Sequence, residues 1–357
     1  MKNEDTYLYI SDILINWYEA NKRDLPWRGI SDPYKIWISE IILQQTRVNQ
    51  GMDYFLRFME RFPTIKILAE ATEDEVLKYW QGLGYYSRAR NLHNAARQIT
   101  TDFGGIFPEK HSEVLKLSGV GEYTAAAICS FAYNQPHAVV DGNVYRVLSR
   151  VFGIKTPIDS GTGKKEFAGL AQKLLSKSNP ATHNQAIMEF GALQCVPSSP
   201  NCEVCPLKSV CRAFEMDEIS NLPVKTNKTK TTNRYFNYLY IKLDNKTFLQ
   251  KRTAKDVWQN LYEFPLLESD KLLEINDLIK NEDFQKLFAG IENVNILKIA
   301  NPIKHVLSHR VIMAQFITVI ISESNQELNQ FIEVPLNEID HFAVSRLIEI
   351  FLEKVER

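Results

Sequence analysis

The sequence predicts a multidomain protein with an all-α part of about 221 residues, a basic linker and a smaller α+β part. Three observations support this fold class. Apolar residues recur at intervals of three and four from Tyr7 to about Ala213, which is typical of packed helices. The composition changes between Leu222 and Arg234, and β-rich segments follow. A length of 357 residues fits two or three domains at roughly 100–200 residues each.

The composition excludes a disordered chain and a membrane-spanning one. Apolar residues make up 45% of the chain and aromatic residues 11%, enough to form sizeable cores. The longest strongly apolar stretch, Val311–Ile321, is far shorter than the roughly 20 residues that cross a bilayer. The acidic N-terminus lacks the apolar run of a signal peptide. We therefore expect a cytoplasmic protein, associated with the nucleoid if the source is bacterial, with no membrane partner.

The charge distribution is too even to identify a partner by itself. The net charge is −1. Residues 1–234 hold 28 Lys and Arg against 25 Asp and Glu, whereas residues 235–357 hold 14 against 18. This balance permits local contacts between the first part and phosphate groups.

Helix boundaries and a linker can be read from the first part. Ser31-Asp32-Pro33 is a cap followed by proline in the first turn, ahead of a helix expected from Tyr34 to Thr46. Asn179-Pro180 opens another helix that runs towards Gln194. From Leu222 to Arg234 the chain is basic and contains no acid. Such a segment is either a solvated linker or one that touches phosphate.

The second part is expected to mix strands and helices. Two β-rich runs flank Asp244-Asn245-Lys246 and form a predicted hairpin. Helical patterns follow, then two further strands and a C-terminal helix. The expected strands are 235–243, 247–252, 294–299 and 311–321, and the expected helices are 270–287 and 336–355.

Four of the five cysteines lie within 17 residues, which in an intracellular protein indicates a metal site before it indicates disulfides. Cys195, Cys202, Cys205 and Cys211 form the pattern C-x6-C-x2-C-x5-C. Structural zinc and a [4Fe–4S] cluster both fit four thiolates. Zinc sites more often have two C-x2-C pairs, so the spacing favours iron–sulfur and leaves zinc open. The fifth cysteine, Cys129, lies on an apolar helix face and is expected in the core.

A glycine pair joins two helical patterns near residues 111–130. Gly119-Val120-Gly121 permits positive φ angles and a close backbone approach, and a helix N-terminus follows. A bare G-x-G is most often a simple turn. The flanking pattern L-x-x-x-G-V-G-x-x-T-A makes a helix–hairpin–helix that grips the phosphate backbone without reading sequence more probable.

These features together resemble the endonuclease III superfamily of DNA glycosylases, and within it the MutY-type adenine DNA glycosylases. The helix–hairpin–helix, Val139–Val144 and the four-cysteine loop carry the resemblance, which is dense from Leu25 to Cys211 and sparser after Arg234. Further matching motifs are Leu25-Pro26-Trp27-Arg28, Trp37–Thr46 and Gly82–Arg90. The resemblance implies one [4Fe–4S] cluster on the four cysteines. It also implies a partner, duplex DNA containing A:8-oxoguanine or A:G, and we expect the enzyme to be a monomer.

Excising adenine needs a general acid at the base and a carboxylate facing the cationic sugar. Glu40 lies among apolar residues, which raise the pKa of a carboxyl, and the resemblance implies that it protonates adenine N7 and later assists water attack. Asp141 has the pattern of a helix N-cap. The resemblance adds that Asp141 stabilises the oxocarbenium ion, with Asn143 beside it. Tyr123 stands where bifunctional relatives carry a nucleophilic lysine, so we expect a monofunctional glycosylase with little or no lyase activity.

The target base must leave the helical stack, and the resemblance assigns residues to the base and to the gap it leaves. Gln185 and Glu189 lie four residues apart and share one helix face. The adenine pocket is expected to consist of Leu25, Trp27, Arg28, Gln185 and Glu189. The expected wedge residues are Gln44, Gln45 and Tyr85, and Arg88, Gly119 and Gly121 are expected to meet the DNA backbone.

By resemblance, residues 1–221 form the catalytic domain, 222–234 the linker and 235–357 a Nudix-like domain that recognises 8-oxoguanine. The clustered acids of a Nudix box are missing, so nucleotide hydrolysis is not expected. A glycine that the family has near Gln259-Asn260 is also missing. Leu307, Ser308 and His309 stand where the family has an F-S-H pattern, with leucine in place of the aromatic residue. The same residues are also typical of a polar turn ahead of a strand.

Two other functions remain open from the sequence. An endonuclease III-type glycosylase and lyase for oxidised pyrimidines would share the fold, but Tyr123 and the long second part argue against it. The pair Glu40 and Asp141 argues against a catalytically silent iron–sulfur protein that binds DNA. Release of free adenine from an A:8-oxoguanine duplex, with no strand cut until alkali is added, separates the three.

Overall fold

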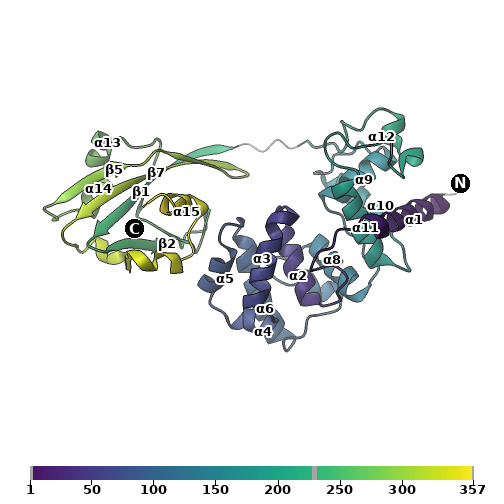
Figure 1. Ribbon diagram of the computed structural model, residues 1–357, viewed down its shortest axis with the longest axis horizontal. Helices are drawn as coiled ribbons and strands as arrows, with labels where there is room; N and C mark the ends of the chain where they lie inside the picture. The colour runs from purple at the N-terminus through teal and green to yellow at the C-terminus, as the bar shows by residue number, and fades with distance from the viewer. Residues whose placement is uncertain (1–2, 227–230, 356–357) are drawn as a thin grey trace. The chain divides into compact units, whose positions relative to one another are not determined.

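The chain folds into a helical unit and a unit built around a β-sheet, which confirms the predicted fold class (Figure 1). The structure is a computed structural model that describes residues 3–226 and 231–355. The first unit comprises Met1–Glu70 and Asn91–Asn227, and the second comprises Ala71–Arg90 and Lys228–Arg357. None of the helices in the described residues is long and apolar enough to cross a membrane.

The first unit is formed by helices joined through short loops. The helix Ser87–Asp102 (α6) begins in the second unit and continues into the first. The other helices of the first unit are α1 (Asn3–Asn21), α2 (Pro33–Leu43), α3 (Val48–Arg61), α4 (Ile65–Glu70), α7 (His111–Val114), α8 (Glu122–Tyr133), α9 (Gly142–Phe152), α10 (Gly161–Leu174), α11 (Pro180–Leu193), α12 (Arg212–Glu215) and a 3-10 turn η1 (Lys208–Val210).

One core of the first unit lies between α1, α9, α10 and α11. The apolar residues of α1 that recur at three and four spacing, including Ile10 and Leu14, face this core. A buried hydrogen bond of 2.7 Å between Ser11 Oγ and His183 Nδ1 joins α1 to α11. Burial lowers the pKa of His183 to about 4, so this imidazole is neutral at physiological pH. The contact fixes the position of α11, which carries part of the site described below.

Helix α2 begins as the sequence predicts and ends earlier. Asp32 caps it by accepting hydrogen bonds from the Tyr34 and Lys35 N–H groups, and Pro33 occupies the first turn. The predicted end at Thr46 is wrong, because the helix stops at Leu43 and Gln45 adopts a left-handed φ of 58°. Gln44 instead turns its side chain to Thr124, where Nε2 donates to Oγ1 over 3.2 Å.

The second unit holds the strands. Its sheet has the order β3-β2-β1-β7-β5, with β4, β6 and β8 paired to β1, β7 and β2. The central pair β1 and β7 is parallel, in continuous register from Thr232↔Arg310 to Leu243↔Ile321. The strands are β1 (Thr232–Leu243), β2 (Lys246–Lys251), β3 (Tyr262–Glu263), β4 (Leu266–Ser269), β5 (Val294–Ile299), β6 (Ile303–Val306), β7 (Arg310–Ile321) and β8 (Ile332–Pro335).

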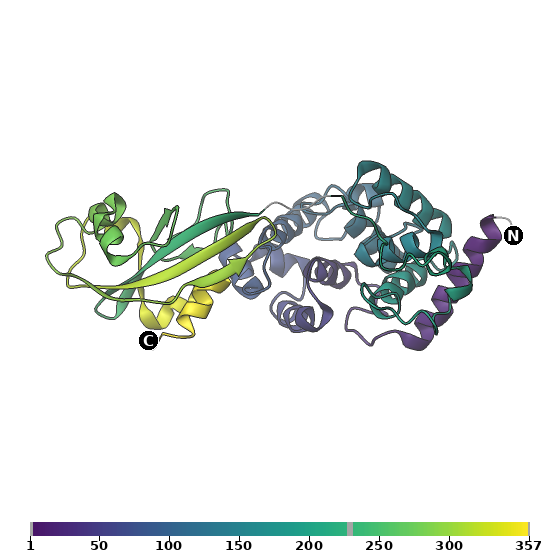
Figure 2. The same ribbon diagram turned by 90° about the horizontal axis from the view of Figure 1, so that it is seen from above.

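Helices cover both faces of this sheet, as Figure 2 shows from above. The helices α13 (Ile275–Lys280) and α14 (Glu282–Leu287) pack on the face that carries Leu239 and Ile241. The helix α15 (Arg346–Leu352) packs on the other face, where Phe351 stacks on Phe316 with ring centroids 4.1 Å apart. The alternation of side chains along β1 places Tyr240 on this second face, against Phe264 and Phe351.

Two helix predictions for this unit need correction. The helix expected over 270–287 is broken at Asn281, whose side chain caps α14 by accepting from the Phe284 N–H. The C-terminal helix expected over 336–355 is a 3-10 helix, η3 (Leu336–His341), followed by α15. Val344 lies between them and forms a β-bridge with Tyr262, so the chain is extended there. A further 3-10 turn, η2 (Leu328–Gln330), precedes β8.

Residues 71–90, which include α5 (Glu73–Trp80), pack with the second unit. Tyr262 donates its hydroxyl to Asp74 over 2.8 Å, and Lys251 pairs with the same carboxylate. Asn260 Nδ2 donates to Glu73 Oε1 over 2.5 Å. Polar side chains therefore fix this segment against the loops beside the sheet.

The described ends of the predicted linker are each held by their own unit. The Leu222 carbonyl accepts a hydrogen bond from Arg150, and the Val224 carbonyl accepts one from the Ile158 N–H. The Thr226 N–H donates to the Asp159 carboxylate. On the other side β1 begins at Thr232, three residues before the predicted strand. Lys228 and Lys230, on which the prediction of phosphate contact partly rests, lie outside the described residues.

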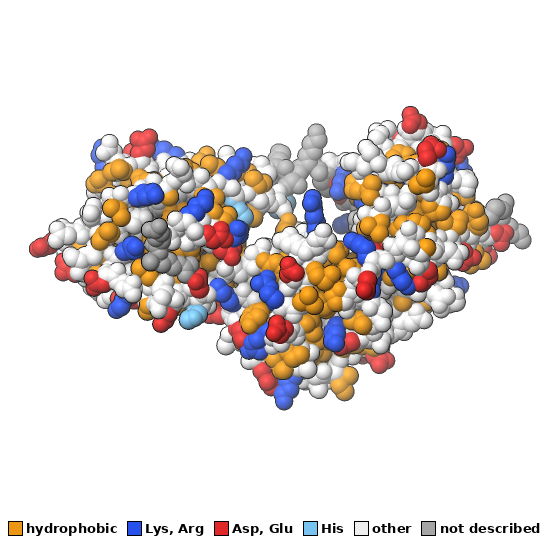
Figure 3. Space-filling view, in the orientation of Figure 1, with side chains coloured by type: hydrophobic (Ala, Val, Ile, Leu, Met, Phe, Trp, Pro, Cys, Tyr) orange, Lys and Arg blue, Asp and Glu red, His pale blue; other side chains and the backbone are white. Residues whose placement is uncertain are grey.

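On the face shown in Figure 3, basic and acidic side chains are interspersed.

Candidate active site

A cleft of about 1030 Å³ opens in the first unit. It is bounded by α2, by the hairpin that leads into α8, by the start of α9, by α11 and by the segment around residues 23–28. Many of the residues predicted from the sequence line this one cleft. They are Leu25, Trp27, Arg28, Glu40, Gln44, Gln45, Gly119, Gly121, Tyr123, Asp141, Asn143, Gln185 and Glu189.

Glu40 lies in the middle of α2, among buried apolar residues, and its side chain reaches the cleft. It is only 7% exposed, and the Tyr123 hydroxyl donates to its Oε2 over 2.7 Å. Burial raises the pKa of the Glu40 carboxyl above its ordinary value, and the charge of Asp141 adds to the rise. The Tyr123 hydrogen bond and the charge of Arg28 oppose it. The result is a carboxyl group that retains its proton to a higher pH than an exposed glutamate.

Asp141 occupies the N-cap of α9, as its sequence context predicts. Its two carboxylate oxygens accept hydrogen bonds of 2.8 Å from the Val144 N–H and from Asn143 Nδ2. Burial raises the pKa of the Asp141 carboxyl above its ordinary value, and these donors and the charge of Arg146 oppose that rise without reversing it. The two acids of the cleft therefore differ in surroundings. Glu40 has one hydroxyl donor in an apolar helix, whereas Asp141 has several donors at a helix N-terminus.

Arg146 ties the Asp141 turn to the cysteine loop. Its guanidinium donates to Asn143 Oδ1 over 2.9 Å, to the Gly191 carbonyl over 2.5 Å and to the Cys195 carbonyl over 2.7 Å. Gly191 is closely packed here, because a Cβ at this position would lie 2.7 Å from the Asn143 Cβ. The Asp141–Asn143 turn is therefore held from α9 and from α11 at the same time.

Another part of the cleft lining carries a buried carboxylate, Glu189, and an aromatic ring, Trp27. Glu189, 1% exposed, accepts two 2.7 Å bonds from Arg23 and one of 3.2 Å from Arg28. Burial alone would raise the pKa of Glu189, but the two guanidinium groups hold it below its ordinary value. Glu189 is thus an ionised acceptor at the cleft wall. Trp27 packs edge-on against Phe55, with ring centroids 5.2 Å apart.

Arg23, which lines the cleft, and Tyr18, which contacts the lining residues Gln185 and Arg28, are not predicted from the sequence. The Tyr18 hydroxyl donates to Gln185 Oε1 over 2.7 Å and accepts from Arg28 over 3.0 Å. Tyr18 follows the apolar spacing of α1 and is indistinguishable there from a core residue. Arg23 follows Lys22 and resembles any solvated basic pair. Their partners lie on α11, more than 160 residues away, so local sequence carries no signal for either.

The glycine hairpin is built as a turn into α8. Gly119 has a φ of 73°, and a Cβ there would lie 2.5 Å from the Asn91 Cβ, so the position requires glycine. Gly121 has an extended φ of −101° and caps α8, so only one of the two glycines uses positive φ. Both are exposed at the cleft edge, where backbone N–H groups of a helix N-terminus face outward.

The four clustered cysteines lie on the loop between α11 and α12, which is held by buried Arg150. Arg150 donates to Cys195 Sγ over 3.5 Å and to the Val196 carbonyl over 2.8 Å. Burial and the neighbouring thiols raise the pKa of Cys205 to about 11. Among the described residues, no three Cys, His, Asp or Glu side chains are gathered closely enough to hold a metal ion as they stand. The thiols are nevertheless near enough to influence one another electrostatically. Cys129 is fully buried in α8.

The remaining predicted residues belong to the second unit. Arg88 lies over the Trp80 ring at 5.3 Å and donates to the Gly84 carbonyl over 3.2 Å, and burial lowers its pKa to about 10. Tyr85 is half exposed, and its hydroxyl lies 2.9 Å from Ser308 Oγ. Leu307, Ser308 and His309 form the turn between β6 and β7. Tyr85 and the predicted recognition residue Ser308 are therefore in direct contact.

Comparisons with known proteins assign both units to families. Residues 38–174 match the model of the HhH-GPD superfamily base excision DNA repair proteins, and residues 237–354 match the NUDIX domain. The chain is 36% identical to the adenine DNA glycosylase of Buchnera aphidicola subsp. Baizongia pistaciae, covering 89% of this chain and 88% of that protein. It is 32% identical to the adenine DNA glycosylase of Buchnera aphidicola subsp. Acyrthosiphon pisum, covering 99% of each.

Other relatives and solved structures match about three fifths of the chain. The human adenine DNA glycosylase is 43% identical over 58% of this chain and 40% of its own length. A thermostable thymine-DNA glycosylase aligns with a TM-score of 0.56 at 28% identity, covering 60% of this chain and 100% of that one. A non-covalent complex of endonuclease III with DNA aligns with a TM-score of 0.53 at 22% identity, covering 61% and 99%, and shares the fold.

The burial of Glu40 predicts that Glu40→Gln stabilises the protein at neutral pH. Folding raises the pKa of the Glu40 carboxyl above its ordinary value of 4.5. Below pH 4.5 the folded state therefore keeps its full stability, and as pH rises above that value the buried carboxyl lowers the free energy of unfolding. Removing the charge should raise the free energy of unfolding by about 1 kcal/mol at pH 7.5, and the gain should shrink towards pH 4.5. Urea unfolding at both pH values measures this. Glu60→Gln, at an exposed glutamate of α3, should change little. A less stable Glu40→Gln at pH 7.5 would contradict the burial argument.

Proposed function

The chain belongs to the adenine DNA glycosylases, base excision repair enzymes of the HhH-GPD superfamily, and we propose that it excises adenine paired with 8-oxoguanine or guanine in duplex DNA. The observation that supports this most directly is the placement of Glu40 and Asp141 on one cleft with different hydrogen-bond partners. One acid is suited to give a proton, and the other is suited to stay ionised.

In the proposed reaction, Glu40 transfers its proton to N7 of the adenine. The C1′–N9 bond then breaks, and its electron pair leaves with the protonated base. The Asp141 carboxylate faces the oxocarbenium ion that remains on the sugar, while Asn143 and Val144 hold that carboxylate in place. Water bonds to C1′ and gives its proton to the Glu40 carboxylate, which restores the enzyme.

The walls of the cleft suit an extruded adenine. Leu25 and Trp27 offer a flat apolar surface, and both are buried at its edge. The ionised Glu189 carboxylate and the Gln185 amide are positioned to accept from and donate to the edge of the base. Arg23, Arg28 and Tyr18 would orient these two side chains before the base arrives.

Tyr123 sets the reaction class. A phenol cannot form a Schiff base with the sugar. The Tyr123 hydroxyl instead donates a hydrogen bond of 2.7 Å to Glu40. Burial and the charge of Glu40 raise the pKa of Tyr123 well above its ordinary value, so its hydroxyl stays protonated. We therefore propose a monofunctional enzyme that leaves an intact abasic strand.

We assign the DNA contacts by position. Gly119 and Gly121 would receive a phosphate at the N-terminus of α8, and Gln44 and Gln45 at the cleft mouth would enter the gap left by the base. In the second unit, Tyr85 is proposed as a separate wedge residue, and Ser308 and His309 would hydrogen-bond the 8-oxoguanine edge. Leu307 offers no ring for stacking. Arg88, which donates to the Gly84 carbonyl and lies over the Trp80 ring, would meet phosphate at an exposed edge of its guanidinium.

We propose that the four-cysteine loop holds one [4Fe–4S] cluster, on the chemistry of its donors, although no three of these side chains in the described residues are gathered closely enough to hold a metal as they stand. Four thiols lie on one loop, those of Cys195, Cys202, Cys205 and Cys211. Arg146 and Arg150 both contact Cys195 at its start, and the Arg150 carbonyl accepts from Cys211 Sγ at its end. The donor set is all sulfur, which suits iron–sulfur clusters. When bound, such a cluster would cross-link the loop, and the Arg146 contacts would connect that loop to the Asp141 turn.

The proposed activity predicts a specific pattern of products. With a duplex containing A:8-oxoguanine, the enzyme should release free adenine, and the strand should break only after alkali treatment. Glu40→Gln should bind the duplex but lower the release rate by about 100-fold or more, because general acid catalysis contributes that much. Strand cleavage without alkali, or excision of oxidised pyrimidines in place of adenine, would refute the proposal. Release should be faster opposite 8-oxoguanine than opposite guanine.

The packing of Gly191 predicts an effect on rate without contact to substrate. In Gly191→Ala the new methyl group must displace Asn143, and with it the Asp141 turn. We expect adenine release under single-turnover conditions to fall at least about tenfold, since displacements near 1 Å at reacting groups have costs of this size. Gly169→Ala on α10 is the matched control, because a Cβ there meets nothing within 4 Å. Equal rates of adenine release in the two variants would contradict a positioning role for α11.

The cysteine assignment predicts which thiol substitution removes the metal. Cys202→Ser should lower bound iron and sulfide and the visible absorbance of the purified protein, because one of four ligands is lost. Cys129→Ser is the matched control, since this thiol is buried in α8 and is not assigned as a ligand. Iron content should be unchanged in that variant. Full iron content in Cys202→Ser, or bound zinc in place of iron in the wild type, would overturn the assignment.

A further inference from the structure

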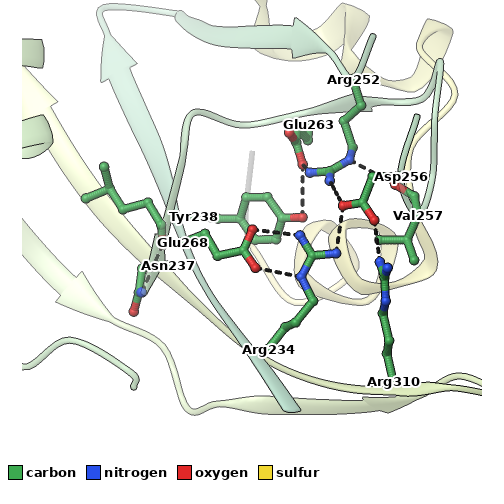
Figure 4. Close-up of polar contacts among 10 residues, drawn as sticks. Arg234, Asn237, Tyr238, Arg252, Asp256, Val257, Glu263, Glu268 and Arg310 are labelled. Atoms are coloured by element: carbon green, nitrogen blue, oxygen red, sulfur yellow. Dashed lines mark hydrogen bonds and ion pairs between the residues drawn. The ribbon is translucent and has the colours of Figure 1, made fainter. Parts of the chain in front are cut away.

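Three arginines of the second unit converge on one carboxylate, that of Asp256 (Figure 4). Asp256 lies in the loop between β2 and β3. Its Oδ2 accepts from Arg234 at the start of β1 over 2.6 Å and from Arg252 after β2 over 3.1 Å, and its Oδ1 accepts from Arg310 at the start of β7. Burial would raise the pKa of Asp256, but the bonds from Arg310 and Arg234 hold it well below its ordinary value. The carboxylate is therefore ionised throughout the working range of pH.

The three arginines do not depend equally on Asp256. Arg234 has a second partner in Glu268, with two bonds of 2.5 and 2.6 Å. Arg252 has a second partner in Glu263 at 2.6 Å. Asp256 is the one carboxylate that Arg310 contacts in the described part of the chain. Removing the charge of Asp256 leaves Arg310 without a counterion and leaves the other two arginines paired.

Arg310 closes the turn that carries Ser308 and His309. Its carbonyl accepts from the Leu307 N–H over 2.8 Å, so the turn is a closed hairpin between β6 and β7. The His309 carbonyl accepts from the Thr232 N–H over 3.1 Å, next to Arg234 on the same strand. The backbone of the turn is thus bonded to Arg310 and to the strand that carries Arg234, and the side chains of both arginines bind Asp256.

The same loop also supports the turn by packing. Trp258, two residues after Asp256, lies against His305 with ring centroids 5.7 Å apart. Trp258 and Asn260 both have left-handed φ angles, 58° and 66°, which non-glycine residues adopt only when their surroundings hold them. Asn260 occupies the region where the family has a glycine, and its side chain uses this conformation to bond Glu73. The loop that presents Asp256 is consequently fixed at several points.

We propose that Asp256 is a positioning residue for recognition of the base opposite adenine, because it holds Arg310 and thereby orients Ser308 and His309. This inference rests on the proposed function, in which those two side chains bind the 8-oxoguanine edge. Asp256 itself would not touch DNA. Its loss should affect discrimination between 8-oxoguanine and guanine more than the excision chemistry in the other unit.

The test is Asp256→Asn in the full-length protein, which keeps the shape of the side chain and removes its charge. Single-turnover rates of adenine release and apparent dissociation constants are measured on otherwise identical A:8-oxoguanine and A:G duplexes. We expect the preference for 8-oxoguanine to fall about tenfold, mainly through weaker binding of the A:8-oxoguanine duplex. The rate on A:G should stay within about twofold of wild type.

Glu268→Gln is the matched control, because it removes a carboxylate from the same network and leaves the Asp256–Arg310 pair intact. It should keep the wild-type preference. Arg310→Gln breaks the pair from the other side and should reproduce the loss seen in Asp256→Asn. The double variant should lose no more than either single one, because both remove the same interaction.

Each result decides between the alternatives. An unchanged preference in Asp256→Asn overturns the inference, as does an equal loss in Glu268→Gln. Asp256→Asn could unfold at a lower temperature and lose activity equally on both duplexes. In that case Arg310→Gln is the deciding variant, and a wild-type preference for 8-oxoguanine in Arg310→Gln overturns the inference. A wild-type enzyme with no preference for 8-oxoguanine would instead refute the assignment of Ser308 and His309 to the 8-oxoguanine edge, whereas a wild-type enzyme that releases no adenine would refute the proposed function.

Discussion

Burial of the Glu40 carboxyl is the constraint on which the catalytic cleft depends. Placing an acid in the middle of an apolar helix favours its neutral form, and the neutral form is the one that can protonate a base. In the reaction that we propose, the same cleft also stabilises a cation. We propose Asp141 for that role because a helix N-terminus and Asn143 supply donors that favour its carboxylate. The surrounding helices place the two acids on one cleft with different hydrogen-bond partners.

Arginines hold the functional turns in both units. Arg146 links the Asp141 turn to α11 and to the first cysteine of the loop through backbone carbonyls and Asn143. Arg310 closes the turn of Ser308 and His309 and is itself held by Asp256. In each case a rigid guanidinium fixes a turn that cannot pack its own hydrophobic core. The side chains that we propose as functional are thus held by charged groups of neighbouring residues.

Local sequence was sufficient wherever a local rule determines structure. Asp32 and Asp141 were identifiable as caps, and Gly119 occupies a turn that requires glycine. The sequence could not show where α2 ends, because the left-handed Gln45 and the Gln44–Thr124 bond are tertiary features. Contacts of Tyr18 and Arg23 with α11, and the packing of residues 71–90 with the second unit, join positions more than 150 residues apart. Asp256 is one acid among many in the sequence, and only the fold gathers three arginines around it.

The most direct test of the assigned acid is the pH dependence of adenine release under single-turnover conditions on an A:8-oxoguanine duplex. The rate should follow a bell-shaped profile whose descending limb reports loss of the Glu40 proton above the ordinary value of 4.5. Because the Tyr123 hydrogen bond lowers the pKa of Glu40, Tyr123→Phe should move that limb to higher pH. A rate that rises steadily with pH, or a limb that stays in place in Tyr123→Phe, would contradict a neutral Glu40 as the proton donor.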